Sequence, residues 1–323
     1  MHALIFEQFG PPEVLQWREV PDPVPPAGHA LVRIAAAGLN FADVYRRRGA
    51  YHMDATPPWI LGYEGAGTIV GLGDADHGGF AVGDRVGFAD APRANAELVA
   101  VPVDKLVALP GEISAELAAA VLLQGLTAHY LVHDSFAVRA GQTAVVHAAA
   151  GGVGLLLTQM LVAKGARVIA LASSATKREA AIRAGASHAF GYDVDWVAEV
   201  RGVQAAGVDV VYESVGSTLP ASMAATRNGG AVVFYGFAGG DPPAVDPRVL
   251  MDRSLTLTGG DLWNVLISAQ ERRRRAAELF AMMRGGALAV TIAAQVPLAD
   301  GAAAHRMLEG RGTIGKLVLT TGA

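Results

Sequence analysis

The sequence contains no cysteine, and this absence removes several classes of chemistry. Disulfides, thiol nucleophiles and cysteine-ligated zinc are all excluded. An excess of charge of one sign is also missing, because 26 Lys and Arg residues balance 30 Asp and Glu residues, a net charge of 26 − 30 = −4. This balance disfavours a general nucleic-acid or anionic-membrane binder.

Long uninterrupted apolar runs are missing too. No stretch approaches about 18 residues without a glycine or a charged residue, so no membrane span is expected. The start, MHALIFEQFG, lacks the basic region and the long apolar region of a signal peptide. The sequence therefore predicts a cytoplasmic protein with no nucleic-acid partner and no membrane partner.

What the chain does contain is ample apolar material and many glycines. Of its 323 residues, 52% are hydrophobic and 39 are glycine, and this length suggests two domains. Up to about residue 120 the chain consists of short strand-like segments, such as ALVRIAAAG and GAGTIVGLG, separated by turn signals such as PDPVPPAG. This pattern predicts an antiparallel barrel or sandwich.

From Thr143 the pattern changes to strands that alternate with helices. TAVVHA, GARVIALAS, VDVVYES, AVVFYGF and SLTLTG are apolar strand candidates, with helices predicted up to about Lys164 and over TKREAAIRAGA. Alternation of this kind predicts a parallel sheet covered on both faces. The tail, with helices near 267–284 and 299–309 and strands near 291–295 and 315–320, is too short for its own core. We expect it to complete the first domain.

A glycine-rich loop joins the strand TAVVHA to the next helix. Gly151 would allow a tight turn, Gly152 a close approach of backbone to a pyrophosphate, and Gly154 close packing of helix on strand. The N–H groups at the helix start, including that of Val153, would then bind the phosphates. Ala149 stands where the G-x-G-x-x-G pattern has its first glycine, so an ordinary strand–helix turn is the alternative.

The end of the following strand indicates which dinucleotide is bound. An NAD site usually has an acidic residue here for the ribose 2′-hydroxyl. This chain has Ser173 and Ser174, followed by Lys177, which suit a 2′-phosphate. We therefore expect NADPH. The alternative is that Ser174 or Thr176 only caps the next helix while Lys177 is solvated, although capping and phosphate binding are compatible.

Several segments taken together resemble one family. GLNFADVYRRRG (38–49), GYEGAGTIVGLG (62–73), LLQGLTAHYLV (122–132), HAAAGGVG (147–154) and GKLVL (315–319) are similar to the zinc-free quinone oxidoreductases of the zeta-crystallin type, in the medium-chain dehydrogenase/reductase superfamily. The resemblance implies an α/β fold: a GroES-like, mostly antiparallel catalytic domain over 1–122 and 264–323, and a Rossmann NADPH-binding domain over 123–263. It also implies a homodimer formed through the Rossmann domain.

Zinc can be considered from the residues themselves. Zinc alcohol dehydrogenases of this superfamily have Gly-His-Glu where this chain has Gly62, Tyr63 and Glu64, so a histidine ligand is missing along with every cysteine. His147, at a strand end, is expected to be a satisfied core residue. We therefore expect chemistry without a metal, which suits a quinone because it is a good electrophile.

The resemblance also implies site residues. Asn40, Asp43 and Tyr45 match positions near nicotinamide and ribose, in a cleft between the domains. Tyr51 and Tyr63 would either reach the substrate or only pack. As alternatives, Asn40 is a turn residue and Asp43 a charge at a helix start. Further cofactor contacts match Thr127, Tyr130, Tyr192, Ser214, Gly236, Phe237, Gly260, Asp261 and Leu262, with Arg311 favoured over Lys316 for a basic contact beside the last strand.

The predicted activity is NADPH-dependent reduction of a quinone. One alternative is reduction of activated C=C bonds in enones, alkenals or enoyl thioesters. Another is an NADPH-binding protein with a structural or RNA-associated role and little turnover. The arginine run ERRRRAAELF (271–280) is interpreted as a solvated helix face with Leu279 and Phe280 turned inward, rather than as an RNA-binding surface.

Overall fold

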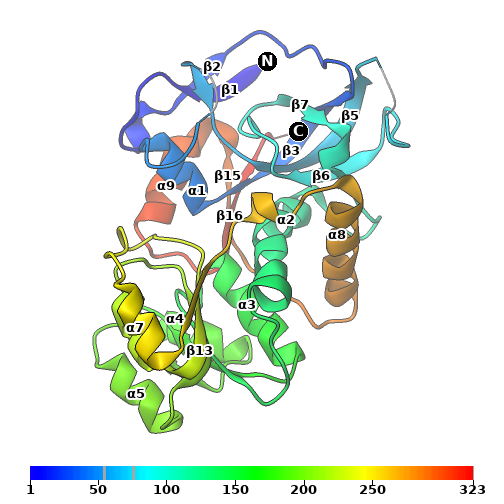
Figure 1. The fold of residues 1–323 in the computed structure, drawn as a ribbon. Helices are drawn as coiled ribbons and strands as arrows, with labels where there is room; N and C mark the ends of the chain where they lie inside the picture. Colours follow the sequence, from blue (N-terminus) through cyan, green and yellow to red (C-terminus); the bar gives the residue numbers. More distant parts are fainter. Residues whose placement is uncertain (54–55, 75–76, 323) are drawn as a thin grey trace. The chain divides into compact units, whose positions relative to one another are not determined.

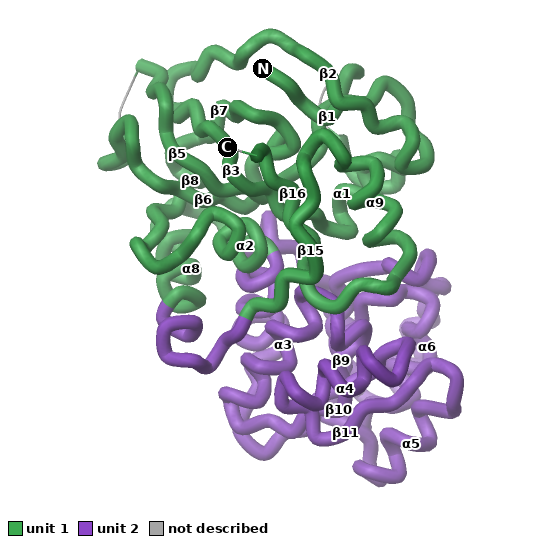
Figure 2. The backbone as a smooth tube through the Cα atoms, turned by 180° about the vertical axis from the view of Figure 1, so that it is seen from behind, with its two compact units in different colours: residues 1–123, 266–280, 290–323 green, residues 124–265, 281–289 purple. Residues whose placement is uncertain are grey.

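The computed structural model describes residues 1–53, 56–74 and 77–322. The chain divides into two units, and Figure 2 shows both chain ends in the first. The first unit comprises residues 1–123, 266–280 and 290–323, and the second comprises residues 124–265 and 281–289. The second unit thus contains the alternating segments and the glycine-rich loop.

The second unit is built on a six-stranded parallel sheet, in the order β11-β10-β9-β12-β13-β14. In chain order this is 3-2-1-4-5-6, the order of a Rossmann sheet. The order reverses between β9 and β12, where such sheets bind their ligands. The strands are β9 Thr143–Val146, β10 Arg167–Leu171, β11 His188–Phe190, β12 Val208–Glu213, β13 Thr226–Phe234 and β14 Thr256–Gly259.

Helices cover this sheet (Figure 1). They are α3 Gly152–Ala163, α4 Ala175–Arg183, α5 Trp196–Val203, α6 Leu219–Ala225 and α7 Pro247–Arg253. Successive strand residues point to opposite faces, and all four residues of β9 are buried, so both faces of the sheet are covered. The structure confirms the predicted parallel sheet and adds the short β11, α5, α6 and α7, which were not predicted.

The first unit is mostly antiparallel. Its larger sheet has the order β15-β16-β3-β5-β6-β8, with β7 also paired to β3, and a smaller sheet has the order β2-β1-β4. The C-terminal β16 pairs with β3, so the tail of the chain extends the sheet begun near the N-terminus. The strands are β1 His2–Phe6, β2 Gln16–Glu19, β3 His29–Leu39, β4 Trp59–Ile60, β5 Glu64–Leu72, β6 Arg85–Ala89, β7 Leu98–Pro102, β8 Leu106–Ala108, β15 Ile292–Pro297 and β16 Lys316–Thr320.

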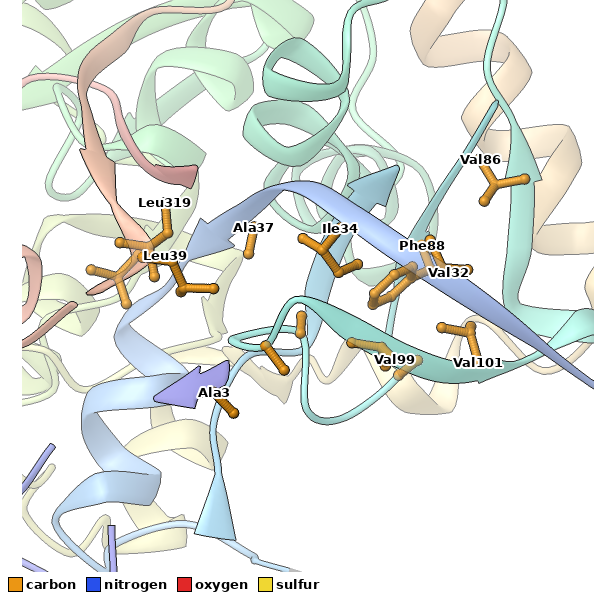
Figure 3. Packing of buried hydrophobic residues seen from close by; sticks show 14 of the residues in the cluster. Ala3, Val32, Ile34, Ala37, Leu39, Val86, Phe88, Val99, Val101 and Leu319 are labelled. Atoms are coloured by element: carbon orange, nitrogen blue, oxygen red, sulfur yellow. The ribbon is translucent and has the colours of Figure 1, made fainter. Parts of the chain in front are cut away.

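Alternate residues of these strands form the core of the first unit. Figure 3 shows Val32 and Ile34 of β3 packed with Phe88 of β6 and Val99 of β7. Each of these four side chains is at most 2% exposed. The spacing of two between Val32 and Ile34 places both on one face of the strand.

The described residues form four further α-helices: α1 Phe41–Arg47, α2 Ala115–Tyr130, α8 Ala269–Arg284 and α9 Gly301–Glu309. In the described part of the chain, the segment formed by α2 and the π-helical turn that follows it, Ala115–Ser135, is the one helix long and apolar enough to span a membrane. In the most apolar stretch of this segment, 72% of the residues are buried inside the structure. Burial among the protein's own elements accounts for that composition.

The arginine run of α8 differs in part from its prediction as a solvated face. Leu279 and Phe280 are buried as predicted, but Arg272 and Arg275 are only 2% and 5% exposed. Arg272 Nη2 donates to Asp90 Oδ2 at 3.1 Å, and Arg275 Nε donates to Glu271 Oε1 at 2.6 Å. The prediction was wrong for these two arginines because acidic partners satisfy their charge within the fold.

Candidate functional site

The carboxyl edge of the parallel sheet gathers most of the predicted cofactor residues. Each of its six strands ends directly before a segment that was singled out in the sequence. Ligands of open parallel sheets bind at this edge. The segments contain Gly151, Gly152 and Val153 after β9, Ser173, Ser174 and Lys177 after β10, Tyr192 after β11, Ser214 after β12, Gly236 and Phe237 after β13, and Gly260, Asp261 and Leu262 after β14.

The glycine-rich loop is closely packed. A Cβ at Gly154 would lie 2.4 Å from Ala148 O and 2.7 Å from Ala149 Cα, so at this glycine the helix lies close to the loop after β9. A Cβ at Gly152 would instead meet Gln124 Oε1 at 1.7 Å. Ala148 has φ +46°, a left-handed conformation that is uncommon for a residue with a side chain. Gly151 is the N-cap of α3, so backbone N–H groups are presented at the start of that helix.

The end of β10 combines a cap and a cation. Ser174 is the N-cap of α4, and its Oγ accepts the N–H of Lys177 at 3.3 Å, so the predicted capping interaction is present. Ser173 and Ser174 are exposed and Lys177 is half-buried. Ser173, Ser174 and Lys177 therefore lie at or just before the first turn of α4.

Further along the sheet edge, the loops after β12 and β13 lie side by side. The Ala238 N–H donates to Ser214 O at 3.1 Å, and a Cβ at Gly236 would lie 3.3 Å from the same oxygen. A Cβ at Gly216 would lie 3.0 Å from Cβ of Phe237. Ser214, Gly236 and Phe237 are thus brought together.

Two of the predicted cofactor residues, Thr127 and Tyr130, lie in the helix α2 and not in a loop at the sheet edge. Tyr130 is 2% exposed, and a Cβ at Gly260 would lie 2.8 Å from its ring, so this tyrosine packs against the segment after β14. Thr127, one turn earlier, is 9% exposed. In the segment itself, Asp261 Oδ1 accepts the N–H of Trp263 at 3.1 Å, and Leu262 is buried.

The first unit contains a buried polar cluster, which we call the Glu64 cluster, formed by Asn40, Asp43, Glu64 and Lys316. Lys316 Nζ donates to Glu64 Oε2 at 2.6 Å and to Asn40 Oδ1 at 2.7 Å. Asn40 Nδ2 donates to Glu64 Oε2 at 3.0 Å, and its backbone N–H donates to Asp43 Oδ2 at 2.9 Å. Asn40 is therefore both the N-cap of α1 and part of an ion-pair network.

Burial governs the electrostatics of the Glu64 cluster. Asp43 and Lys316 are each 1% exposed, and Glu64 is fully buried. Burial raises the pKa of the Asp43 carboxyl, although the nearby Arg46 opposes this shift. Burial lowers the pKa of the Lys316 ammonium group, against the attraction of Glu64. The predicted alternative role of Asp43 as a charge at a helix start agrees with its place in the capping box.

Arg46 joins two of the predicted tyrosines. Its guanidinium carbon lies 3.6 Å from the ring centre of Tyr63 and 4.8 Å from that of Tyr51. These are cation–π distances. Tyr45 lies next to Phe41, with 6.3 Å between ring centres, and all three tyrosines are half-buried.

The two basic candidates near the last strand differ. Lys316, the first residue of β16, is enclosed in the Glu64 cluster. Arg311 is exposed and has φ +52°, between α9 and β16. The structure thus leaves Arg311 as the more accessible of the pair.

Sequence reasoning missed several residues that the structure places in these groups. Gln124 lies against Gly152, Glu64 is the centre of the Glu64 cluster, and Arg46 holds Tyr51 and Tyr63. Gln124 and Glu64 fall inside the quoted motifs LLQGLTAHYLV and GYEGAGTIVGLG, but a place in a motif does not show which residues a side chain contacts. His147 is fully buried and hydrogen-bonded, which confirms it as a satisfied core residue.

Within the described ranges, no three histidine, aspartate or glutamate residues lie close enough together to hold a metal ion. The segment Gly62–Glu64, where zinc enzymes of the superfamily have Gly-His-Glu, directs Glu64 to Lys316. The donor set at this position is therefore one carboxylate already paired with an ammonium group.

Comparison with known protein families agrees with the two units. Residues 26–139 match the alcohol dehydrogenase GroES-like domain, and residues 152–281 match the zinc-binding dehydrogenase family. The α/β fold with a GroES-like and a Rossmann part is therefore confirmed.

Relatives match over nearly the whole chain. A probable quinone oxidoreductase of Schizosaccharomyces pombe is 38% identical over 96% of this chain and 94% of its own. A 2-haloacrylate reductase of Burkholderia is 35% identical over 98% of both chains. The solved Escherichia coli quinone oxidoreductase complexed with NADPH aligns with a TM-score of 0.95 at 34% identity, over 99% of this chain and 100% of that one. This protein belongs to the quinone oxidoreductase family of the medium-chain dehydrogenases/reductases.

Proposed function

We propose that this protein is an NADPH-dependent quinone oxidoreductase that works without zinc. The observation that carries the proposal is the carboxyl edge of the 3-2-1-4-5-6 sheet, where six successive loops supply the predicted cofactor residues. Quinone oxidoreductases at 35–38% identity over nearly the whole chain support the reaction class.

The residues at this edge fit NADPH. The first turn of α3 offers backbone N–H groups behind Gly151 and contains no acidic residue, so it suits the pyrophosphate. Gly154 keeps α3 close to the loop at Ala148. Ser173, Ser174 and Lys177 would bind the 2′-phosphate, with one cation and two hydroxyl donors.

When bound, the reduced nicotinamide supplies a hydride. The protein's own residues then have to orient the reactants and exclude water. We assign Thr127, Tyr130 and the segments after β12, β13 and β14 to contacts along the ribose and nicotinamide. In the first unit, Lys316 and Glu64 fix the amide of Asn40, and Arg46 fixes Tyr51 and Tyr63, so these polar groups are preorganised before a substrate binds.

The proposal that zinc is not needed rests on the residue types present. The chain has no cysteine, and Tyr63 stands where zinc enzymes of the superfamily have a histidine. A quinone accepts hydride without Lewis-acid activation. Activity should therefore survive exhaustive treatment with EDTA. Loss of activity on metal removal, restored by about one zinc ion per chain, would contradict this part of the proposal.

A second candidate function is reduction of activated C=C bonds. It is favoured by the similarity to a 2-haloacrylate reductase, at 35% identity over 98% of both chains. The third candidate, an NADPH-binding protein with little turnover, predicts cofactor binding without oxidation.

The deciding experiment follows NADPH oxidation against ortho-quinones, para-quinones, enones and 2-haloacrylate, with NADPH alone as the background. We expect turnover with quinones at a higher kcat/KM than with any C=C substrate. A higher kcat/KM for an enone or for 2-haloacrylate would favour the second candidate. Tight binding of NADPH with no turnover on any substrate would favour the third.

A further inference from the structure

A chain of buried side chains lies beneath the glycine-rich loop. His147, Glu213 and Ser222 are each fully buried, and Tyr192 joins them from the loop after β11. Tyr192 Oη lies 3.3 Å from His147 Nδ1, and Ser222 Oγ lies 3.0 Å from His147 Nε2. Ser222 Oγ also donates to Glu213 Oε2, and that carboxylate oxygen lies 3.4 Å from His147 Nε2 as well. The mechanism proposed above uses none of these groups except Tyr192.

The hydrogen bonds of this chain run in one direction. The Ala148 N–H donates to Tyr192 Oη at 3.0 Å, which leaves the phenol to donate to His147 Nδ1. His147 then carries its proton on Nε2, and this N–H donates a hydrogen bond to Ser222 Oγ. The Ser222 hydroxyl in turn donates a hydrogen bond to the Glu213 carboxylate. Burial lowers the pKa of His147, which agrees with the neutral tautomer that this direction requires.

The two ends of the chain contact two loops at the ligand-binding edge of the sheet. At one end is Ala148, whose φ of +46° is costly for a residue with a side chain. At the other end, Glu213 Oε1 accepts the N–H groups of Val215 at 2.7 Å and Gly216 at 3.0 Å. These loops follow β9 and β12, the neighbouring strands between which the sheet order reverses.

We propose that the Glu213–Ser222–His147–Tyr192 chain is a positioning device that holds the glycine-rich loop in the conformation that binds the cofactor pyrophosphate. This proposal rests on the proposed binding of NADPH. His147, Ser222 and Glu213 are fully buried, so they act through the backbone of the loop. Ala148 stays left-handed because its N–H has a fixed acceptor, and Gly151 then closes the turn by donating to Ala148 O at 2.8 Å.

The test breaks the chain at two places. Tyr192→Phe removes the hydroxyl next to the loop, and Ser222→Ala removes the hydroxyl that bridges His147 to Glu213, out of reach of any ligand. Each variant should weaken NADPH binding about threefold or more, the effect of losing one hydrogen bond. NADH should weaken by the same factor, because both dinucleotides have the pyrophosphate. KM for NADPH should rise while kcat stays within about twofold.

The double variant gives the sharpest outcome. If the chain acts as one unit, Tyr192→Phe combined with Ser222→Ala should bind NADPH no more weakly than the weaker-binding single variant. Additive losses would mean that Tyr192 contacts the cofactor independently, and would overturn the proposal. A loss confined to NADPH would overturn it as well, because it would indicate a contact with the 2′-phosphate.

Tyr212→Phe is the matched control. Tyr212 is a fully buried tyrosine of β12 whose hydroxyl has no hydrogen-bond partner among the residues described, so its removal should leave cofactor affinity unchanged. Thermal melting of each apo variant verifies that binding is measured on folded protein. Variants that bind like wild type would overturn this proposal alone. Failure of the wild type to bind NADPH would overturn the proposed function and this proposal with it.

Discussion

At the scale of single residues, we expect Lys177 to favour NADPH over NADH. It lies in the first turn of α4, which follows Ser173 and begins at the N-cap Ser174. Loss of one charge-assisted contact with a 2′-phosphate is worth about 1.5–3 kcal/mol, roughly tenfold or more in affinity. We expect Lys177→Ala to raise the Kd for NADPH by that factor and to leave NADH almost unchanged, as measured by titration of nicotinamide fluorescence.

Lys164→Ala is the control for this prediction. Lys164 is the C-cap of α3, at the end of that helix away from the glycine-rich loop. It should bind NADPH as wild type does. Equal losses of NADPH and NADH in Lys177→Ala would refute the assignment of the 2′-phosphate.

We expect His305, in α9, to make the stability of the fold sensitive to acid. It is fully buried, Arg47 Nη1 donates to its Nδ1 at 2.8 Å, and its Nε2 has no partner among the described atoms. Burial and the neighbouring Arg47 lower its pKa to about 3, from an ordinary value of 6.5. Between these values the unfolded chain binds a proton that the folded protein cannot, so stability is lost as pH falls from 6.5 towards 3.

Replacing this histidine should remove that loss. Between about pH 7.5 and pH 5, His305→Gln should lose about 2 kcal/mol less of its free energy of unfolding than wild type, as measured by urea denaturation. His188→Gln, at an exposed position of β11, controls for the removal of a histidine elsewhere. An identical pH slope for wild type and His305→Gln would count against a buried neutral imidazole.

At the scale of elements, two glycines at the start of α3, Gly152 and Gly154, have different surroundings. A Cβ at Gly154 would meet backbone atoms of Ala148 and Ala149, whereas the atoms nearest to a Cβ at Gly152 belong to the terminal amide of Gln124. Backbone cannot move aside as a flexible side chain can. We expect Gly154→Ala to lower the free energy of unfolding by about 1–3 kcal/mol, typical of overpacking. Gly152→Ala should lower it much less.

Cofactor binding should respond differently from stability. Gly152→Ala should still weaken NADPH binding, because it displaces the Gln124 side chain of α2 from the start of α3, where we expect the pyrophosphate to bind. Apo melting curves and fluorescence titrations of both variants are the measurements. A Gly152→Ala variant as unstable as Gly154→Ala would show that Gln124 cannot shift.

The α8 helix illustrates what a periodic pattern leaves open. The run of four arginines predicts a helix well, and the structure has one over Ala269–Arg284. The pattern does not show that Asp90, 182 residues away in sequence, would pair with Arg272. Helix formation follows from local sequence, whereas burial of a charge depends on what a distant segment places beside it.

At the scale of the whole molecule, the prediction concerns assembly. β14 is one of the two edge strands of the six-stranded sheet, and an edge strand offers backbone groups for pairing with a second copy. Met251 of α7, shortly before it in sequence, is 71% exposed. We expect a homodimer formed through the second unit, with a sedimentation-equilibrium mass of twice the chain.

Thr256→Lys, an exposed substitution on β14, should shift the protein towards monomer, because lysine on an edge strand opposes pairing. Val24→Lys is the control, at a position 85% exposed in the first unit, and should leave the mass unchanged. A monomeric wild type, or a dimer indifferent to Thr256→Lys, would refute assembly through this strand.

The sequence by itself determined those features that depend on local order along the chain. The alternation of apolar strands and helices from Thr143 predicted the parallel sheet, because hydrophobic periodicity reflects which face of an element is buried. The loop around Gly151 and the hydroxyls at Ser173 and Ser174 predicted a dinucleotide site, because all of them follow strand ends. The lack of cysteine excludes thiol chemistry whatever fold the chain adopts.

Only the tertiary structure decided how polar groups are paired in the interior. Glu64 and Lys316 are 252 residues apart in sequence, yet they form the ion pair that fixes Asn40. His147 and Ser222 are 75 residues apart in sequence and are joined by a hydrogen bond next to the glycine-rich loop. A buried polar group must find a partner, but the chain can supply that partner from any distant segment. The sequence therefore shows which residue types are present, but not which partners they find. The partners depend on how the fold brings β3, β5 and β16 together, and likewise β9, β12 and α6.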